Sequence, residues 1–393
     1  MSIQNISTSF PQATAKILGR GSVSQRRKNV QTVEDSEAKM KIPVPVLRPR
    51  GPSRPRIVAG LGAIGGALLF AWTIRAAGLG AVLGGVRRLG TGFIVVLLFG
   101  GVRQFVRTVA WRSCLESPDR LSLGSAFLAF VAGDSLGNVT PFGVLISEPS
   151  KILLTRRHVS PSATIAALTV ENLLYSASVV VLLLSGTAVL LLWFTVTPPL
   201  RIASLGVLAG TLALTAAGLW VLGTRRRVAS RLCALAIRHN IVRRYLEPRF
   251  EHVEDVEDQV FSFADRHPNK ILAVLGLEVV YHATAVAEIW VALSMITGAP
   301  ASILTAFALE YVNRSITTVF QFVPMWLGVD EAGTGLVTAA LQLGPATGVS
   351  LALARKGRNL IWTAAGIGLL VHEGFSVAQF YSFAGVHPVR IRD

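Results

Sequence analysis

The chain has 393 residues, of which 51% are hydrophobic and 15% charged, whereas ordinary globular proteins carry about 25% charged residues. This composition excludes an ordinary soluble protein and indicates a polytopic membrane protein. The formal charge of +16 would suggest nucleic-acid binding in a soluble protein, but the basic residues flank apolar runs, so no nucleic-acid partner is expected.

The first 56 residues differ from the rest of the chain. Residues 1–56 are rich in Ser, Gln and Pro and contain eleven Lys or Arg but three acids. They cannot bury enough apolar surface to fold alone, so we expect a disordered, basic cytoplasmic tail. Anionic headgroups would attract this tail, although a solvated topology signal fits equally well.

Apolar runs predict an all-α fold with about six full membrane spans, because about 20 helical residues cross a bilayer. The expected spans are residues 57–74, 91–111, 173–196, 202–224, 270–297 and 346–371. Basic loops stay in the cytoplasm, and the loop at residues 225–270 contains eight arginines between Arg225 and Arg249. Its acidic second part predicts either an amphipathic helix on the membrane face or a solvated linker.

The same rule orients the whole chain. The basic residues place the N-terminus and the tail at residues 376–393 in the cytoplasm, so we expect a multi-pass protein of the inner (cytoplasmic) membrane. The transmembrane domain then covers residues 57–375.

Two segments must begin and end on the same side of the membrane if the other spans are to fit. Residues 121–157 and 301–343 each hold a proline followed seven residues later by a glutamate: Pro141 with Glu148, and Pro324 with Glu331. Broken backbone at membrane depth is tolerated where it is buried in protein or lines a wet cavity. We therefore expect two re-entrant helical hairpins from opposite sides. They suggest an inverted repeat, although chance explains the spacing equally well.

Ionisable side chains inside apolar runs cost about 2.5–3.5 kcal/mol or more, so each is expected to have a partner and a purpose. Glu310 and Arg314 have the order and spacing of a helical ion pair, and a purely structural pair is one interpretation. Arg103 and Arg107 share a helix face and are expected to extend to the headgroups. The other candidates are Glu171, Asn172, Glu278, His282, Glu288, Arg355, Lys356 and Arg358.

Recognised catalytic and metal motifs are missing from the sequence. It contains no HExxH, Walker loop or Asp-x-Asp pair, and its seven histidines and two cysteines are scattered. We therefore expect no metal, no cofactor and no catalytic residue.

The two broken segments resemble motifs of the flippase-like membrane domain named for the transmembrane region of lysylphosphatidylglycerol synthase. The resemblance covers about residues 57–375, with Ser147 and Asn172 in place of the usual glycine and arginine. The first motif comprises Asn138, Pro141, Gly143, Glu148 and Lys151, with Glu171 following. The second comprises Pro324, Gly328 and Glu331, with Arg355 and Arg358 following.

The resemblance implies movement or presentation of a polar-headed lipid, such as a phospholipid, an isoprenoid-linked glycan or a hopanoid. The two-domain synthases also have a soluble aminoacyl-transferase domain. Only residues 376–393 follow the membrane part here, so lysine transfer is not expected. The leading hypothesis is a lipid translocator in which the motif residues line a cavity for the headgroup, with Arg156 and Arg157 at its cytoplasmic mouth.

Other readings of the sequence stay open. The chain could be the membrane subunit of a lipid-modifying transferase whose catalytic domain lies on another chain, or a structural protein whose charges only pair helices. Membrane lipids are the expected partners of a lipid translocator and of a transferase subunit. A homodimer and a transferase partner are both compatible with the sequence.

Overall fold

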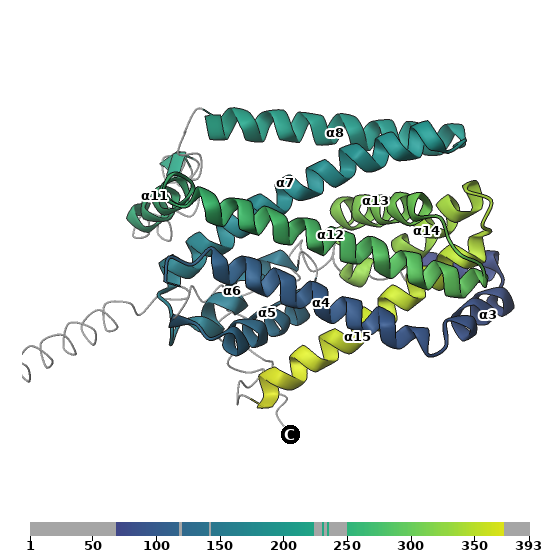
Figure 1. Ribbon diagram of the computed structural model, residues 1–393, viewed down its shortest axis with the longest axis horizontal. Helices are drawn as coiled ribbons and strands as arrows, with labels where there is room; N and C mark the ends of the chain where they lie inside the picture. The colour runs from purple at the N-terminus through teal and green to yellow at the C-terminus, as the bar shows by residue number, and fades with distance from the viewer. Residues whose placement is uncertain are drawn as a thin grey trace, which may run out of the picture. The chain divides into compact units, whose positions relative to one another are not determined.

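A computed structural model describes residues 68–117, 120–140, 143–223, 230–231, 234–235 and 250–372 (Figure 1). Every regular element in these ranges is a helix, which confirms the all-α prediction for the described part of the chain. The predicted tails at residues 1–56 and 376–393, Pro141 and most of the arginine-rich loop lie outside the described residues.

Several helices are long enough to cross a bilayer. One further span is possible if two shorter helices are taken together. These are the helix Leu68–Ala77 and α3 (Leu79–Leu89), and the chain bends by 87° between them. The glycine at the bend, Gly78, has a φ of 86°, in the left-handed region that favours glycine. The four long apolar helices are α4 (Gly92–Ser113), α7 (Pro161–Trp193), α8 (Pro198–Gly223) and α12 (Pro268–Thr297). The chain is thus a multi-pass membrane protein, and its described residues contain four or five apolar spans.

The last helix, α15 (Pro345–His372), has 28 residues and corresponds to the sixth predicted span. Its middle carries three basic side chains, which explains why it is less apolar than the other long helices. The acidic segment after the arginine-rich loop forms α11 (Phe250–Arg266), which packs against α7 and buries Phe263. This favours the amphipathic-helix interpretation of that segment.

Two pairs of short helices separate the long ones. α5 (Leu123–Asn138) packs against α6 (Val144–Thr155), and α13 (Ile303–Val319) packs against α14 (Val329–Ala340). Their 12 to 17 residues give lengths of about 18–25 Å, which is less than the ~30 Å of a hydrocarbon core. Neither pair therefore consists of two full spans.

Local sequence explains where these short helices begin and end. Ser122 caps α5, because its Oγ accepts a hydrogen bond from the Ser125 amide. Between α13 and α14, Pro324 starts a 3₁₀ turn, η3 (Pro324–Trp326). Gly328, with a φ of 81°, then precedes α14. The breaks fall inside the two segments that the sequence marks as broken.

The antiparallel helices α4 and α12 pack against each other in the middle of the bundle (Figure 1). Arg88, just before α4, donates a hydrogen bond to the carbonyl of Ile296 near the end of α12 at 3.4 Å. Lys270, at the start of α12, donates to the carbonyl of Leu115 beyond the end of α4 at 3.1 Å. α7 and α13 pack on one side of α12, while α15 contacts α4, α5 and α14. This arrangement brings the charged positions of five helices together.

The contact between α14 and α15 depends on a glycine. A Cβ added to Gly348 would overlap the carbonyl group of Thr334. We expect Gly348→Ala to lower the free energy of unfolding by about 1–3 kcal/mol through overpacking. Gly368→Ala, on the same helix with nothing within 4 Å, is the control and should be stabilising by up to about 1 kcal/mol. Thermal unfolding of the purified protein in detergent measures both, and equal stabilities would contradict this packing.

Candidate functional site

Charged side chains lie inside the helix bundle in three clusters. The central cluster joins α4, α7, α12, α13 and α15; the α5–α6 cluster and the α14–α15 cluster lie within the two pairs of short helices and their neighbours. Each cluster contains both acids and bases, as a low-dielectric interior requires.

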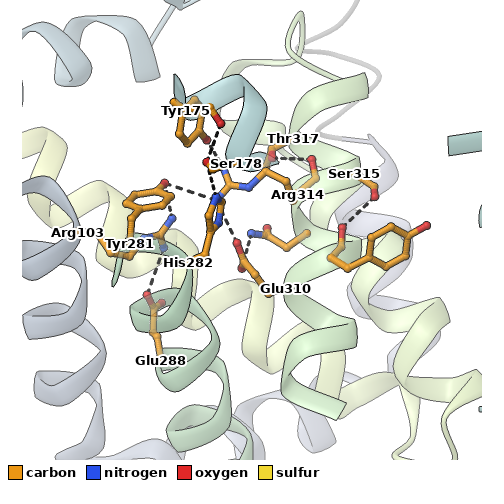
Figure 2. Close-up of polar contacts among 12 residues, drawn as sticks. Arg103, Tyr175, Ser178, Tyr281, His282, Glu288, Glu310, Arg314, Ser315 and Thr317 are labelled. Atoms are coloured by element: carbon orange, nitrogen blue, oxygen red, sulfur yellow. Dashed lines mark hydrogen bonds and ion pairs between the residues drawn. The ribbon is translucent and has the colours of Figure 1, made fainter. Parts of the chain in front are cut away.

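The central cluster contains four arginines and four glutamates (Figure 2 shows part of it). They are Arg103, Arg107, Arg314, Arg358, Glu171, Glu278, Glu288 and Glu310. All four glutamates are 1% exposed. Ionised carboxylates buried to this extent need cations or hydrogen bonds around them.

Ion pairs neutralise three of the four glutamates. Arg107 Nε lies 2.6 Å from Glu171 Oε1, which joins α4 to α7. Arg314 Nη2 lies 3.0 Å from Glu310 Oε1 one turn away on α13. Glu288 of α12 accepts two guanidinium groups on its Oε2, from Arg103 at 3.4 Å and from Arg358 of α15.

Two tyrosines complete the central cluster. The Arg107 guanidinium lies 3.9 Å from the centroid of the Tyr175 ring, a cation–π contact that is strengthened by desolvation. Arg314 donates a 2.6 Å hydrogen bond to Tyr175 Oη, and Arg103 donates a 2.7 Å bond to Tyr281 Oη. The phenol oxygens thus add acceptors for guanidinium groups that would otherwise lack them.

The structure corrects the expectation that Arg103 and Arg107 extend to the headgroups. Their side chains are only 14% and 12% exposed, and both point to acids on α12 and α7. Partners on neighbouring helices are close enough to neutralise the two guanidinium groups in place. Helix spacing in the sequence identifies the shared face of α4, but it does not identify the helices that this face contacts.

The α14–α15 cluster pairs two acids with two bases. Asp330 Oδ1 lies 2.7 Å from Arg355 Nη2, and Glu331 Oε1 lies 2.5 Å from Lys356 Nζ. The other Glu331 oxygen accepts a 2.7 Å hydrogen bond from the amide of Gly328, at the break before α14. Glu331 is 0% exposed, so it links the broken backbone to the long helix α15 from a fully buried position.

The α5–α6 cluster has one base and two acids. Lys151 Nζ lies 2.9 Å from Asp134 Oδ1, 3.1 Å from Glu148 Oε1 and 4.0 Å from the centroid of the Phe130 ring. Ser147 Oγ donates a 2.9 Å hydrogen bond to Asp134 Oδ1. The serine that departs from the family pattern thus makes a direct contact with this cluster.

A groove of about 300 Å³ opens between α6 and α7 beside this cluster. Its polar lining consists of Glu148, Thr169, Asn172 and Ser176. Its apolar lining consists of Ile152, Ile165, Leu168 and Leu173. Glu148 Oε2 is buried and has no hydrogen-bond partner among the described residues, although Oε1 is paired with Lys151. The groove therefore combines an apolar wall with an unused hydrogen-bond acceptor.

The remaining predicted residues are placed as follows. Asn138 Nδ2 donates a 3.3 Å hydrogen bond to Thr363 Oγ1 of α15, and Gly143 lies against Gly137 so closely that an added Cβ would overlap its backbone. Arg156 and Arg157 are exposed at the end of α6. Glu148, Glu331 and Arg358 belong to three different clusters, and Glu148 is the one that lines the groove.

Sequence reasoning missed four important side chains: Asp134, Tyr175, Tyr281 and Asp330. Asp330 directly precedes Glu331, and Asp134 lies one helical turn from Asn138, so their proximity to motif residues was an available signal. Tyrosine has no comparable signal, because it is as common in apolar cores as beside charges. The described residues contain no group of three or more His, Cys, Asp or Glu side chains that could hold a metal ion.

Comparisons with known proteins give one match. The family model described as "Lysylphosphatidylglycerol synthase TM region" matches residues 57–367, which include all three clusters. No curated protein and no solved structure matches the chain significantly.

The pair between Arg107 and Glu171 provides a direct test of the central cluster. We expect Arg107→Ala to lower the free energy of unfolding by about 3–5 kcal/mol, because it leaves a buried carboxylate unpaired. Replacing both residues with leucine should recover most of this loss, since no bare charge remains. Arg266→Ala is the control: its pair with Glu116 is more than half exposed, so it should cost about 0–1 kcal/mol. Thermal unfolding in detergent measures all three, and a harmless Arg107→Ala would contradict the buried pair.

Proposed function

Because the chain belongs to the family of the lysylphosphatidylglycerol synthase transmembrane region, we propose that it moves a polar-headed lipid between the leaflets of the inner membrane. The family match supports a membrane lipid-related role. The observation that carries the finer proposal is the groove between α6 and α7, which offers an apolar wall and a free acceptor oxygen to one ligand.

A lipid has the chemistry that this groove accepts. Ile165, Leu168 and Leu173 would contact an acyl chain, while Glu148 and Asn172 would hydrogen-bond to a headgroup. Such a site needs few polar groups for orientation, because apolar contact supplies most of the buried area.

The groove also offers a route into the bundle. Asn172 lines the groove, and its Oδ1 lies 3.5 Å from Nη2 of Arg107 in the central cluster. A headgroup that displaces Asn172 would therefore meet a guanidinium, whose planar donors match a phosphate. We propose that Arg156 and Arg157 attract anionic headgroups at the cytoplasmic mouth, and that Glu331, Arg355 and Arg358 act deeper along the path.

The order of the helices supports the proposal of an inverted repeat. α4 to α7 and α12 to α15 each run as a long helix, two short helices and a long helix. The packing has the same symmetry, because the first short helix of each half packs against the last long helix of the other half: α5 against α15, and α13 against α7. In this proposal the pairs α5–α6 and α13–α14 are re-entrant hairpins from opposite faces, the architecture in which transporters bind substrate near the midplane.

Lipid movement can be measured in vesicles that contain the full chain and fluorescently labelled phosphatidylglycerol, with an impermeant quencher outside. We expect Ser176→Trp to slow movement by about tenfold, equivalent to ~1.4 kcal/mol on the barrier, because the indole would fill the groove. Ser185→Trp, at another exposed position of the same helix, is the matched control and should have no effect.

Two outcomes would count against this function. Equal rates for both tryptophan variants would exclude the groove as the lipid site. Lipid movement no faster than in protein-free vesicles would oppose translocation. If a copurified transferase then modified a lipid only with this chain present, the alternative of a transferase subunit would replace it.

The proposed topology has its own test. In a chain with Cys114 and Cys233 replaced, Thr197→Cys and Gln342→Cys place single thiols at exposed turns. Both should react in whole cells with an impermeant thiol reagent, whereas Arg157→Cys should react only after permeabilisation. Labelling of the cysteine at position 342 only after permeabilisation would contradict the opposed hairpins.

A further inference from the structure

Glu278 of α12 differs from every other embedded carboxylate. It is 1% exposed, and neither of its oxygens has a hydrogen-bond partner among the described residues. The other embedded acids in the three clusters each form an ion pair. An unpaired, ionised carboxylate at this depth would cost several kcal/mol, which favours the neutral, protonated form.

The helices around Glu278 bring few groups that could hold it as an anion. Glu278 interacts electrostatically with Arg107 of α4, with Cys114 directly after α4, and with Glu171 of α7 and Arg314 of α13. Arg107 and Arg314 are already bound to Glu171 and Glu310, so each is neutralised by an acid of its own.

Other neighbours are engaged as well. Ser178 of α7 donates its hydroxyl proton to the carbonyl of Tyr175 at 2.7 Å, and its Oγ shares a 3.0 Å hydrogen bond with Nε2 of His282, one turn from Glu278. Arg358 of α15 is held by Glu288. α3 meets the far end of α12 near Ile296, and α11 precedes its start, so both contact other parts of this helix.

The balance of charge over the three clusters is compatible with one protonated carboxyl group. The α14–α15 cluster contains two acids and two bases, and the α5–α6 cluster contains two acids and one base. The central cluster contains four acids, Glu278 included, and four arginines. One carboxyl group is therefore in excess over the three clusters together, so one can be protonated without a net positive charge; the missing ion pair, and not this count, identifies Glu278 as that group.

We propose that Glu278 is a proton-binding site that couples lipid movement to the proton gradient across the membrane. This inference rests on the proposed function. When the bundle opens to one side, the O–H bond of Glu278 breaks, its electron pair stays on the carboxylate, and the water that enters solvates the new charge. The proton passes to water on that side, and uptake of a proton from water on the other side restores the protonated state.

The proton site can be tested without any lipid movement. Infrared spectra of the full chain in lipid nanodiscs at neutral pH should contain the carbonyl band of a protonated carboxyl group. Glu278→Gln should lose this band, and Glu116→Gln, which changes an exposed glutamate, should keep it. Thermal unfolding checks that both variants are folded. A wild-type spectrum without the band, or a band that persists in Glu278→Gln, overturns the site.

Coupling is then measured with the labelled phosphatidylglycerol vesicles under an imposed pH difference. With one proton per lipid, one pH unit should shift the final distribution of the probe by up to about tenfold (~1.4 kcal/mol). Glu278→Gln should remove this shift, and Glu116→Gln should retain it. A distribution that does not respond to the gradient overturns the coupling. An infrared band without any lipid movement overturns the proposed function and leaves the proton site standing.

Discussion

Neutralisation of charge inside a hydrocarbon environment is the constraint on which this structure depends. Each arginine or lysine of the three clusters would be costly in lipid if it were alone, and each has an acid within ion-pair distance. Most of these pairs join different helices, so they specify which helices are neighbours where apolar packing alone would specify little. The same pairs also bring the broken helices α6 and α14 to the charged interior.

Much of the fold follows from the sequence, because apolar length and broken segments are local properties. Long apolar runs identify α8 and α12, and Pro324 marks the break before α14. The bend at Gly78 is different, since it turns the chain by 87° just beyond the first predicted span, which ends at residue 74. A single glycine in a glycine-rich stretch does not reveal which position will bend.

The site was less predictable because it depends on contacts between helices. Motif residues such as Glu148 and Glu331 could be identified from the sequence, but their partners Lys151 and Lys356 lie one turn away and on another helix, respectively. Spacing along the sequence can reveal a pair within one helix, such as Glu148 with Lys151, but not a pair between two helices, such as Glu331 with Lys356. The contact of Tyr175 with Arg314 depends on the packing of α7 against α13, which the sequence does not reveal.

Glu288 is shared between two arginines on different helices. One of its oxygens binds guanidinium groups from both α4 and α15, and the other oxygen is buried without a partner in the described part of the chain. Half a rotation of the carboxylate would present the vacant oxygen to the same two arginines. The carboxylate can therefore pair with both arginines through either oxygen, so this one side chain joins α4, α12 and α15 at a single point.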